Sequence, residues 1–136
     1  MIDCNKVYIK QSEICKDGLG AFAKDKIKKG DRVEIGLVRL LSDNSNKCFD
    51  GMNNPYVFTW SDDIPNYTWA IGSGCATFYN TNSEENSNTI FKRYFKEMCF
   101  EIIAKRNIEK DEELTHTYKS LEWRTVFRVV RNLLNY

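Results

Sequence analysis

The chain has 136 residues, a length that suits one domain with a single hydrophobic core. With 42% hydrophobic and 29% charged residues it is typical of a globular chain, and no apolar run approaches the roughly 20 residues of a membrane helix. The formal net charge of +1 lacks the basic excess that nucleic-acid or anionic membrane binding usually requires. We therefore expect one domain over residues 1–136, with no membrane contact and no direct nucleic-acid binding.

The N-terminus and the cysteines indicate an intracellular protein, in the cytoplasm or the nucleus. Residues 1–6 lack the basic start and the apolar stretch of a secretory signal. The cysteines are odd in number and form no C-x-C or C-x-x-C pair that could bring two thiolates to one zinc ion. They are Cys4, Cys15, Cys48, Cys75 and Cys99. We interpret them as reduced thiols that mainly pack, and we predict no metal site.

Short β-rich runs dominate the first two thirds of the chain. Their apolar and β-branched residues predict strands at 7–9, 20–23, 32–41 and 56–60. Two polar stretches rich in turn-forming residues are predicted as loops, at 42–55 and 80–88. The chain continues with a predicted strand at 98–104 and a turn at 107–113 that leads into 114–118. This pattern predicts a mainly β domain.

From Ser120 the apolar period changes to that of a helix, which we predict over about residues 120–134. The apolar face of this helix consists of Trp123, Val126, Phe127, Val130, Leu133 and Leu134. A stripe beside it consists of Arg124, Arg128 and Arg131, and we interpret this stripe as a solvated face. The predicted class is therefore α+β, with one C-terminal amphipathic helix.

Four segments carry motifs in a recognisable order. They read K-D-G-L-G-A-F-A at 16–23 continued by I-K-K-G-D-R-V-E at 27–34, Y-V-F at 56–58, A-T-F-Y-N-T-N-S-E-E-N at 76–86, and A-K-R-N-I-E-K-D-E-E-L-T-H-T-Y at 104–118. Over about residues 7–118 they resemble the SET-domain family of protein lysine methyltransferases, whose compact viral and bacterial members look similar. The resemblance implies a SET fold of several small curved sheets with a knot-like C-terminal crossing, which ordinary topological rules disfavour.

The resemblance also implies an activity and a cofactor. It implies an enzyme that uses S-adenosylmethionine, without a metal, to methylate the ε-amine of a protein lysine, and that releases S-adenosylhomocysteine. The first motif then places Gly18, Leu19 and Gly20 at the methionine part of the cofactor, since glycine lets backbone groups approach a ligand closely. A Rossmann fingerprint is excluded because no third glycine and no helix follow. Alone, this G-x-G also fits a plain tight turn.

The third motif resembles the family's R-F-x-N-H-S-C-x-P-N loop, which holds the adenosyl half of the cofactor. The resemblance implies that Tyr79, Asn80 and Thr81 contact the cofactor. The chain departs from the family pattern at Thr81, Asn82 and Glu85, where His, Ser and Pro are usual.

Two registers of this loop are open. In one register Asn80 opens the motif and Asn86 closes it. In the other, Asn82 and Ser83 form the Asn-Ser pair and Asn88 closes the motif. The sequence alone does not choose between them.

The fourth motif is the most specific. It matches A-x-R-x-I-x-x-G-E-E-L-x-x-x-Y, except that Asp111 replaces the glycine, and Tyr118 occupies the position of the family's catalytic tyrosine. Tyr56 of the Y-V-F motif corresponds to a tyrosine beside the lysine channel. Apolar walls there would favour the neutral amine of a lysine, whose pKa in water is near ~10.4. We assign Tyr118 and Tyr56 as catalytic candidates; a strand-end tyrosine bonded to backbone is the plainer alternative.

His116, Trp123 and Phe127 are candidates for the substrate channel. The resemblance implies that residue 116 influences how many methyl groups are added, although a polar residue packed at a strand end fits equally well. The helix face that carries Trp123 and Phe127 fits two roles equally, a wall of the channel or core packing against the sheet.

The expected partner is a protein or peptide that carries a lysine, such as a histone tail. An extended peptide would add to a sheet edge, and Glu84 and Glu85 would favour basic peptides. An exposed helix face would also allow a homodimer. The altered loop motif leaves a second hypothesis open, a catalytically inactive SET domain that binds proteins, whereas the retained glycines and Tyr118 favour the enzyme.

Overall fold

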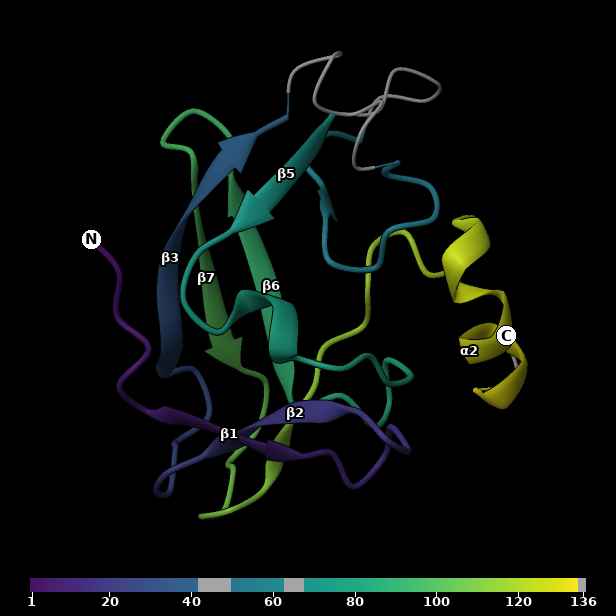
Figure 1. Ribbon diagram of the computed structural model, residues 1–136. Coiled ribbons are helices and arrows are strands. Elements are labelled where there is room, and N and C mark those ends of the chain that lie inside the picture. Colours follow the sequence, from purple (N-terminus) through teal and green to yellow (C-terminus); the bar gives the residue numbers. More distant parts are fainter. Residues whose placement is uncertain (42–49, 63–67, 135–136) are drawn as a thin grey trace.

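The computed structural model of the protein describes residues 1–41, 50–62 and 68–134. Over these residues the chain forms two antiparallel sheets, short 3₁₀ turns and one short helix (Figure 1). The mainly β architecture predicted from the sequence is confirmed. No helix within the described ranges is long and apolar enough to cross a membrane.

The larger sheet has the strand order β4-β5-β3-β7-β6. Its strands are β3 (Arg32–Leu40), β4 (Phe58–Thr59), β5 (Trp69–Gly72), β6 (Thr89–Tyr94) and β7 (Cys99–Ala104). Alternate residues of β7, namely Phe100, Ile102 and Ala104, are buried in the core, as the two-residue period of a strand requires. This sheet supplies most of the hydrophobic core.

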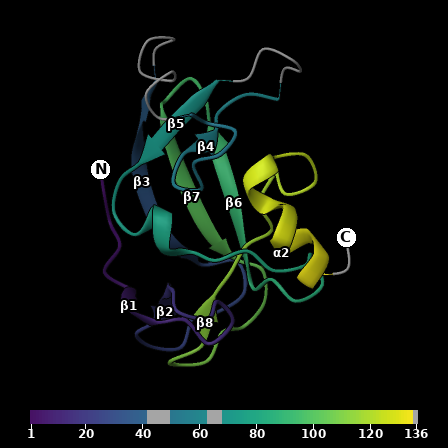
Figure 2. The ribbon, with the colours of Figure 1, turned by 45° about the vertical axis from the view of Figure 1, so that its right-hand side comes forward.

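The smaller sheet has the order β1-β2-β8 and lies at one end of the larger sheet (Figures 1 and 2). Its strands are β1 (Val7–Gln11), β2 (Leu19–Ala23) and β8 (Glu113–Leu114). The central strand β2 is buried at every position after Leu19. Because Ala21 is paired with Leu114, the sheet joins residues from the two ends of the SET resemblance.

The chain from β8 onward crosses the loop 79–89. We call residues 113–118, which include β8, the crossing segment. On one arm of the loop, Asn80 forms a parallel bridge with Thr115. On the other arm, the Thr89 amide donates to the Thr115 carbonyl at 3.0 Å. Bonds to both arms of one loop are what the predicted C-terminal crossing requires.

The C-terminal helix is shorter than predicted. Only Arg128–Leu133 is α-helical (α2), and it follows the 3₁₀ turn η2 (Thr125–Phe127), at the side of the molecule away from the N-terminus (Figure 2). Four residues of this region are buried, Ser120, Leu121, Arg124 and Phe127, and the last three lie three residues apart. Three-residue spacing belongs to 3₁₀-type turns. The prediction of a C-terminal helix is confirmed, but its predicted extent over 120–134 is wrong, and Leu133 of the predicted apolar face is 77% exposed.

The strands predicted from the sequence agree with the observed strands in some places and not in others. Those at 20–23, 32–41 and 98–104 match β2, β3 and β7 closely. The strands β5 and β6 were missed, because β5 is short and β6 carries adjacent basic residues in its second half. Residues 42–49 of the predicted polar loop lie outside the described residues.

Candidate functional site

Tyr118, at the end of the crossing segment, is the centre of the candidate site. Its hydroxyl donates to the Tyr79 carbonyl oxygen at 2.5 Å, and its backbone N–H donates to Thr81 Oγ1 at 3.1 Å. Burial raises the pKa of Tyr118, and the cationic Arg124 offsets this only in part. Tyr118 is therefore a neutral phenol that is held firmly against the loop predicted to bind the cofactor.

A small cavity adjoins Tyr118, and one of its sides is aromatic. Its volume is about 30 Å³, which is room for about two water molecules. The walls include Phe91, His116 and Phe127. The rings of His116 and Phe127 each lie 5.1 Å from the Tyr118 ring, centroid to centroid. These contacts support the prediction that Tyr118, His116 and Phe127 share one site.

The polar walls of the same cavity carry only one sign of charge. Among the described residues its charged lining residues are Arg93, Lys119 and Arg124, of which Arg93 is paired with Asp62 outside the lining. Such surroundings disfavour a further cation and favour a neutral amine. These surroundings therefore favour the deprotonated form of any amine that enters the cavity.

The G-x-G segment is tied to the loop 79–89 through Asn80. The Asn80 Nδ2 group donates to the Leu19 carbonyl at 3.0 Å and to Glu113 Oε1 at 3.3 Å. Leu19 itself is 53% exposed. Two segments predicted to hold the cofactor thus meet on the crossing segment, next to Tyr118.

The space beside both glycines of this motif is occupied by other side chains of the protein. A Cβ on Gly20 would lie 2.2 Å from Glu113 Oε1, and one on Gly18 would lie 2.8 Å from Cys15 Sγ. Both positions are filled by the protein's own side chains. Glu113 is itself fixed, because Ser12 Oγ donates to its Oε1 at 2.5 Å.

The structure combines the two possible registers of the loop motif. Asn80 opens the loop, as in the first register. Asn88 closes it, as in the second: its Nδ2 donates to the Glu113 carbonyl at 2.8 Å and its Oδ1 accepts from the Thr115 amide at 2.9 Å. Asn86, by contrast, is exposed. Asn88 is therefore a positioning residue that the first register missed.

His116 is fully enclosed by aromatic rings. It stacks on Phe91 at 5.3 Å and also contacts Tyr79 and Tyr118. Neither ring nitrogen has a hydrogen-bond partner among the described residues. Burial lowers the pKa of His116 to about 4, and the backbone of Thr117 offsets this only in part. His116 is therefore a neutral member of the channel wall at physiological pH.

Arg124 is the main surprise, because its predicted solvated position is wrong. Its side chain is only 2% exposed. The guanidinium donates to the backbone carbonyls of Gly51, Asn54 and Val57 at 2.6, 2.5 and 3.1 Å. It also lies 4.8 Å from the centroid of the Phe127 ring. Arg124 thus binds the C-terminal segment to the chain before β4, and no local sequence signal indicated this.

Two predicted site residues lie elsewhere. Tyr56 is 64% exposed and does not line the cavity, although its neighbour Val57 does. Tyr56 sits one residue off the inward-facing position, because only Phe58–Thr59 of this run is a strand. Trp123 does not line the cavity either, and its ring packs 6.2 Å from that of Trp69. Phe91 takes their place in the wall, and the unpredicted strand β6 carries it.

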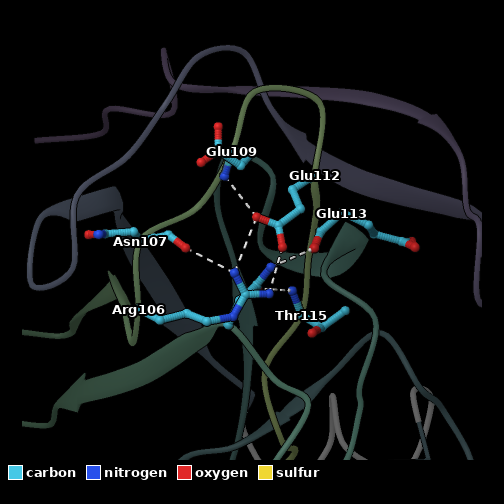
Figure 3. Close-up of polar contacts among 7 residues, drawn as sticks. Arg106, Asn107, Glu109, Glu112, Glu113 and Thr115 are labelled. Atoms are coloured by element: carbon cyan, nitrogen blue, oxygen red, sulfur yellow. Dashed lines mark hydrogen bonds and ion pairs between the residues drawn. The ribbon is translucent and has the colours of Figure 1, made fainter.

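The fourth motif forms a compact polar turn before the crossing segment (Figure 3). Arg106 donates to both carboxylate oxygens of Glu112, at 2.5 and 3.3 Å, and Glu112 accepts from the Glu109 amide at 2.8 Å. Asp111, in place of the family's glycine, has a φ of +66°. Aspartate tolerates this left-handed conformation better than most residues. The departure from the motif therefore keeps its backbone shape.

This geometry agrees with the comparison against known families. The SET domain family matches residues 18–119, which is most of the chain. The protein therefore belongs to the SET domain family. No curated protein sequence matches the chain.

Solved structures show the same fold. A candidate histone methyltransferase from Plasmodium falciparum superposes with a TM-score of 0.60 at 23% identity, over 83% of this chain and 92% of that one. The Polycomb Repressive Complex 2 of Chaetomium thermophilum, in an autoinhibited form bound to S-adenosylmethionine, gives a TM-score of 0.69 at 20% identity. A humanized mutant of that complex bound to an inhibitor gives 0.68 at 20% identity. The similarity covers 87% of this chain but only 16% of each Chaetomium chain.

Proposed function

We propose that this SET domain transfers a methyl group from S-adenosylmethionine to the ε-amine of a lysine in a protein substrate. The observation that carries the proposal is the position of Tyr118. Its hydroxyl lies 2.5 Å from the carbonyl of Tyr79, between the aromatic cavity and the segments at Leu19 and Asn80. One phenol thus adjoins both the expected lysine channel and the expected cofactor residues.

The residues present fit the cofactor. Asn80 and Thr81 place half-buried polar side chains beside the exposed residue Leu19. When bound, S-adenosylmethionine supplies a methyl group made electrophilic by its sulfonium. Gly18, Leu19 and Gly20 would hold its methionine part, and the loop residues Tyr79, Asn80 and Thr81 its adenosyl part.

The protein's contribution is to position the amine and to keep it neutral. A free lysine amine has a pKa near ~10.4, so it must lose its proton before it attacks. The apolar rings and the basic residues Lys119 and Arg124 of the cavity lining disfavour the ammonium form. The Tyr118 hydroxyl donates a hydrogen bond to the Tyr79 carbonyl. Its oxygen lone pairs are therefore available for weak C–H···O contacts. Alignment then supplies most of the rate.

We also propose that His116 sets how many methyl groups the site accepts. The ring is neutral and packed on Phe91, so it occupies volume at the channel wall without adding charge. Replacing it by a smaller residue would enlarge the space beside the amine. We expect His116→Ala to shift the product distribution toward higher methylation states, as read by mass spectrometry of a methylated peptide.

The proposed substrate is a basic protein segment, with a histone tail as the first choice. The exposed side chains of Glu84 and Glu85 on the loop 79–89 support this choice, since they would attract positive charge near the site. An unchanged peptide affinity in the double variant Glu84→Gln, Glu85→Gln would contradict their part in recognition.

One observation favours a second candidate function, a SET domain that binds proteins without catalysis. The cavity of about 30 Å³ admits only about two waters. A lysine side chain could therefore enter only if the residues at the cavity wall move. Under this alternative Tyr118 serves only to hold the loop.

The test combines cofactor binding with methyl transfer. Calorimetric titration with S-adenosylmethionine and S-adenosylhomocysteine should show saturable binding, and a radiolabelled donor should label histone peptides. Tyr118→Phe should lower methyl transfer by about 100-fold and leave cofactor affinity nearly unchanged. Tyr94→Phe is the matched control, because the Tyr94 hydroxyl bonds Glu101 on the larger sheet, away from the cavity. Absence of cofactor binding would favour the non-catalytic module.

A further inference from the structure

A second cluster of reactive groups lies outside the candidate methyltransferase site. It consists of Cys4, ahead of β1, Glu34 on β3 and Cys75 at the start of η1 (Ala76–Phe78). One potential ligand atom from each residue lies within 4.8 Å of the other two. The glutamate is buried and the two thiols are half-buried. These three side chains therefore converge on one point that solvent can reach.

The fold brings the three segments together through β3. The Asp3 amide donates to the Ile35 carbonyl at 2.8 Å and the Ile35 amide donates back at 3.0 Å, which sets Cys4 beside this strand. Further along the same edge of β3, Val38 pairs with Gly72, so the chain that follows β5 carries Cys75 to the same place. The convergence is thus fixed by backbone pairing.

Glu34 is an acid buried without a cation. Its side chain is 1% exposed, and among the described residues no lysine or arginine forms an ion pair with it. Its oxygens accept from the Tyr79 hydroxyl at 2.7 Å and the Cys75 amide at 2.9 Å. Burial raises the pKa of Glu34. A buried carboxylate is costly unless it is paired or coordinates a metal.

Gly74 leaves the cluster open. Its φ is +61°, and a Cβ there would lie 2.3 Å from Glu34 Oε2 and 3.6 Å from Cys4 Sγ. Any side chain at this position would therefore enter the space between the potential ligands. Glycine keeps that space available to an ion.

We infer that Cys4, Glu34 and Cys75 bind a thiophilic divalent cation of the zinc type, with water completing a four-coordinate shell. Two thiolates and one carboxylate suit zinc, whereas calcium and magnesium prefer oxygen ligands alone. Each thiol would lose its proton to solvent as its metal–sulfur bond forms, and so would Glu34 if it is protonated.

The site would serve to position the loop at Tyr118. Tyr79 donates its hydroxyl to Glu34 at 2.7 Å and accepts the Tyr118 hydroxyl at its carbonyl at 2.5 Å. Only one residue thus separates the proposed ion ligand from Tyr118. The ion would also link the N-terminal segment, β3 and η1. The inference does not depend on methyl transfer.

The test uses cobalt as a coloured substitute for zinc. The whole chain, kept reduced by a thiol-free phosphine under anaerobic conditions, is titrated with Co²⁺ and then with Zn²⁺. We expect thiolate-to-cobalt charge-transfer absorption that saturates and is displaced by zinc. Cys4→Ser and Cys75→Ser should each weaken cobalt binding by at least about 100-fold, and Cys99→Ser should leave it unchanged.

A measurement on the unaltered chain guards against misfolded variants. Zinc should slow the alkylation of Cys4 and Cys75, located by peptide mass spectrometry, and leave the exposed Cys15 reacting at its original rate. Absence of the cobalt absorption in the reduced chain, or an equal absorption in the Cys4→Ser variant, would overturn the inference. A Cys4–Cys75 disulfide that forms in air together with no cobalt binding after reduction would overturn it in favour of a redox pair. None of these readouts requires enzymatic activity.

Discussion

The crossing segment and the C-terminal segment meet at Tyr118 but are held by different means. The crossing segment is bonded through its backbone to β2, to Asn80 and to Asn88, so many contacts share the task. The C-terminal segment is held mainly through side chains, by the rings of Trp123 and Phe127 and above all by Arg124, which reaches three backbone carbonyls. The tyrosine is therefore held by a network of backbone bonds, whereas one side of the cavity next to it has Arg124 as its main polar anchor.

The largest expected effect is the loss of that anchor. Arg124→Met leaves buried carbonyls without a donor, and we expect the free energy of unfolding to fall by about 4 kcal/mol. Arg128→Met, at an exposed position of α2, is the control and should change stability little. Urea unfolding followed by circular dichroism measures both. Equal stabilities of the two variants would show that the C-terminal segment has other anchors.

The second expected effect is a dependence on pH that belongs to the crossing segment. The folded-state pKa of His116 is about 4, below the ~6.5 of an unfolded histidine. The unfolded chain thus takes up the proton first, and stability that is complete above about pH 6.5 falls by about 3 kcal/mol by about pH 4.

His116→Phe isolates this effect, because phenylalanine fills the aromatic site and does not titrate. The difference in unfolding free energy between the two proteins should change across that pH window and be constant above it. A constant difference throughout would mean that His116 finds a proton acceptor when charged.

A smaller effect tests the redundancy of the crossing segment itself. Asn88→Ala removes the bonds to the Glu113 carbonyl and the Thr115 amide, which we expect to cost about 2 kcal/mol. Asn86→Ala, at an exposed loop position, is the matched control. Thermal unfolding compares the two. If Asn88→Ala destabilised the protein more than Arg124→Met does, the contrast between network and anchor would be reversed.

The smallest effect concerns the turn that leads into the crossing segment. Asp111 has a φ of +66° and accepts from the Tyr8 hydroxyl at 2.8 Å. Both Asp111→Gly and Asp111→Ala remove that bond, but alanine also strains the backbone. We expect the alanine variant to be less stable by about 1 kcal/mol, as measured by chemical unfolding. Equal stabilities would indicate that the turn relaxes.

Local features of the sequence predicted local structure well. The β-rich runs predicted β2, β3 and β7 because their apolar residues and flanking turns act over a few positions. The four ordered motifs predicted the SET fold, and they placed Tyr118 beside Asn80 and the G-x-G segment. In the structure Asn80 bonds Leu19 of the G-x-G segment, and Tyr118 bonds Tyr79, the neighbour of Asn80.

Contacts between distant residues were beyond prediction from one sequence. The pairing of Asn88 with the crossing segment, the burial of Arg124 against Gly51 and the approach of Cys4 to Cys75 all depend on the final topology. The helical spacing of the three arginines predicts a solvated Arg124. Residues 125–127 form a 3₁₀ turn instead of an α-helix, so the spacing does not apply at Arg124.

The crossing has a consequence for how the chain folds. The buried strand β2 obtains its second neighbour only from residues 113–114, so during synthesis that edge stays unpaired until most of the chain has emerged. An apolar strand with an open edge is prone to pair with another chain. Such long-range pairing is also slow. We therefore expect the yield of native protein on refolding to fall as chain concentration rises.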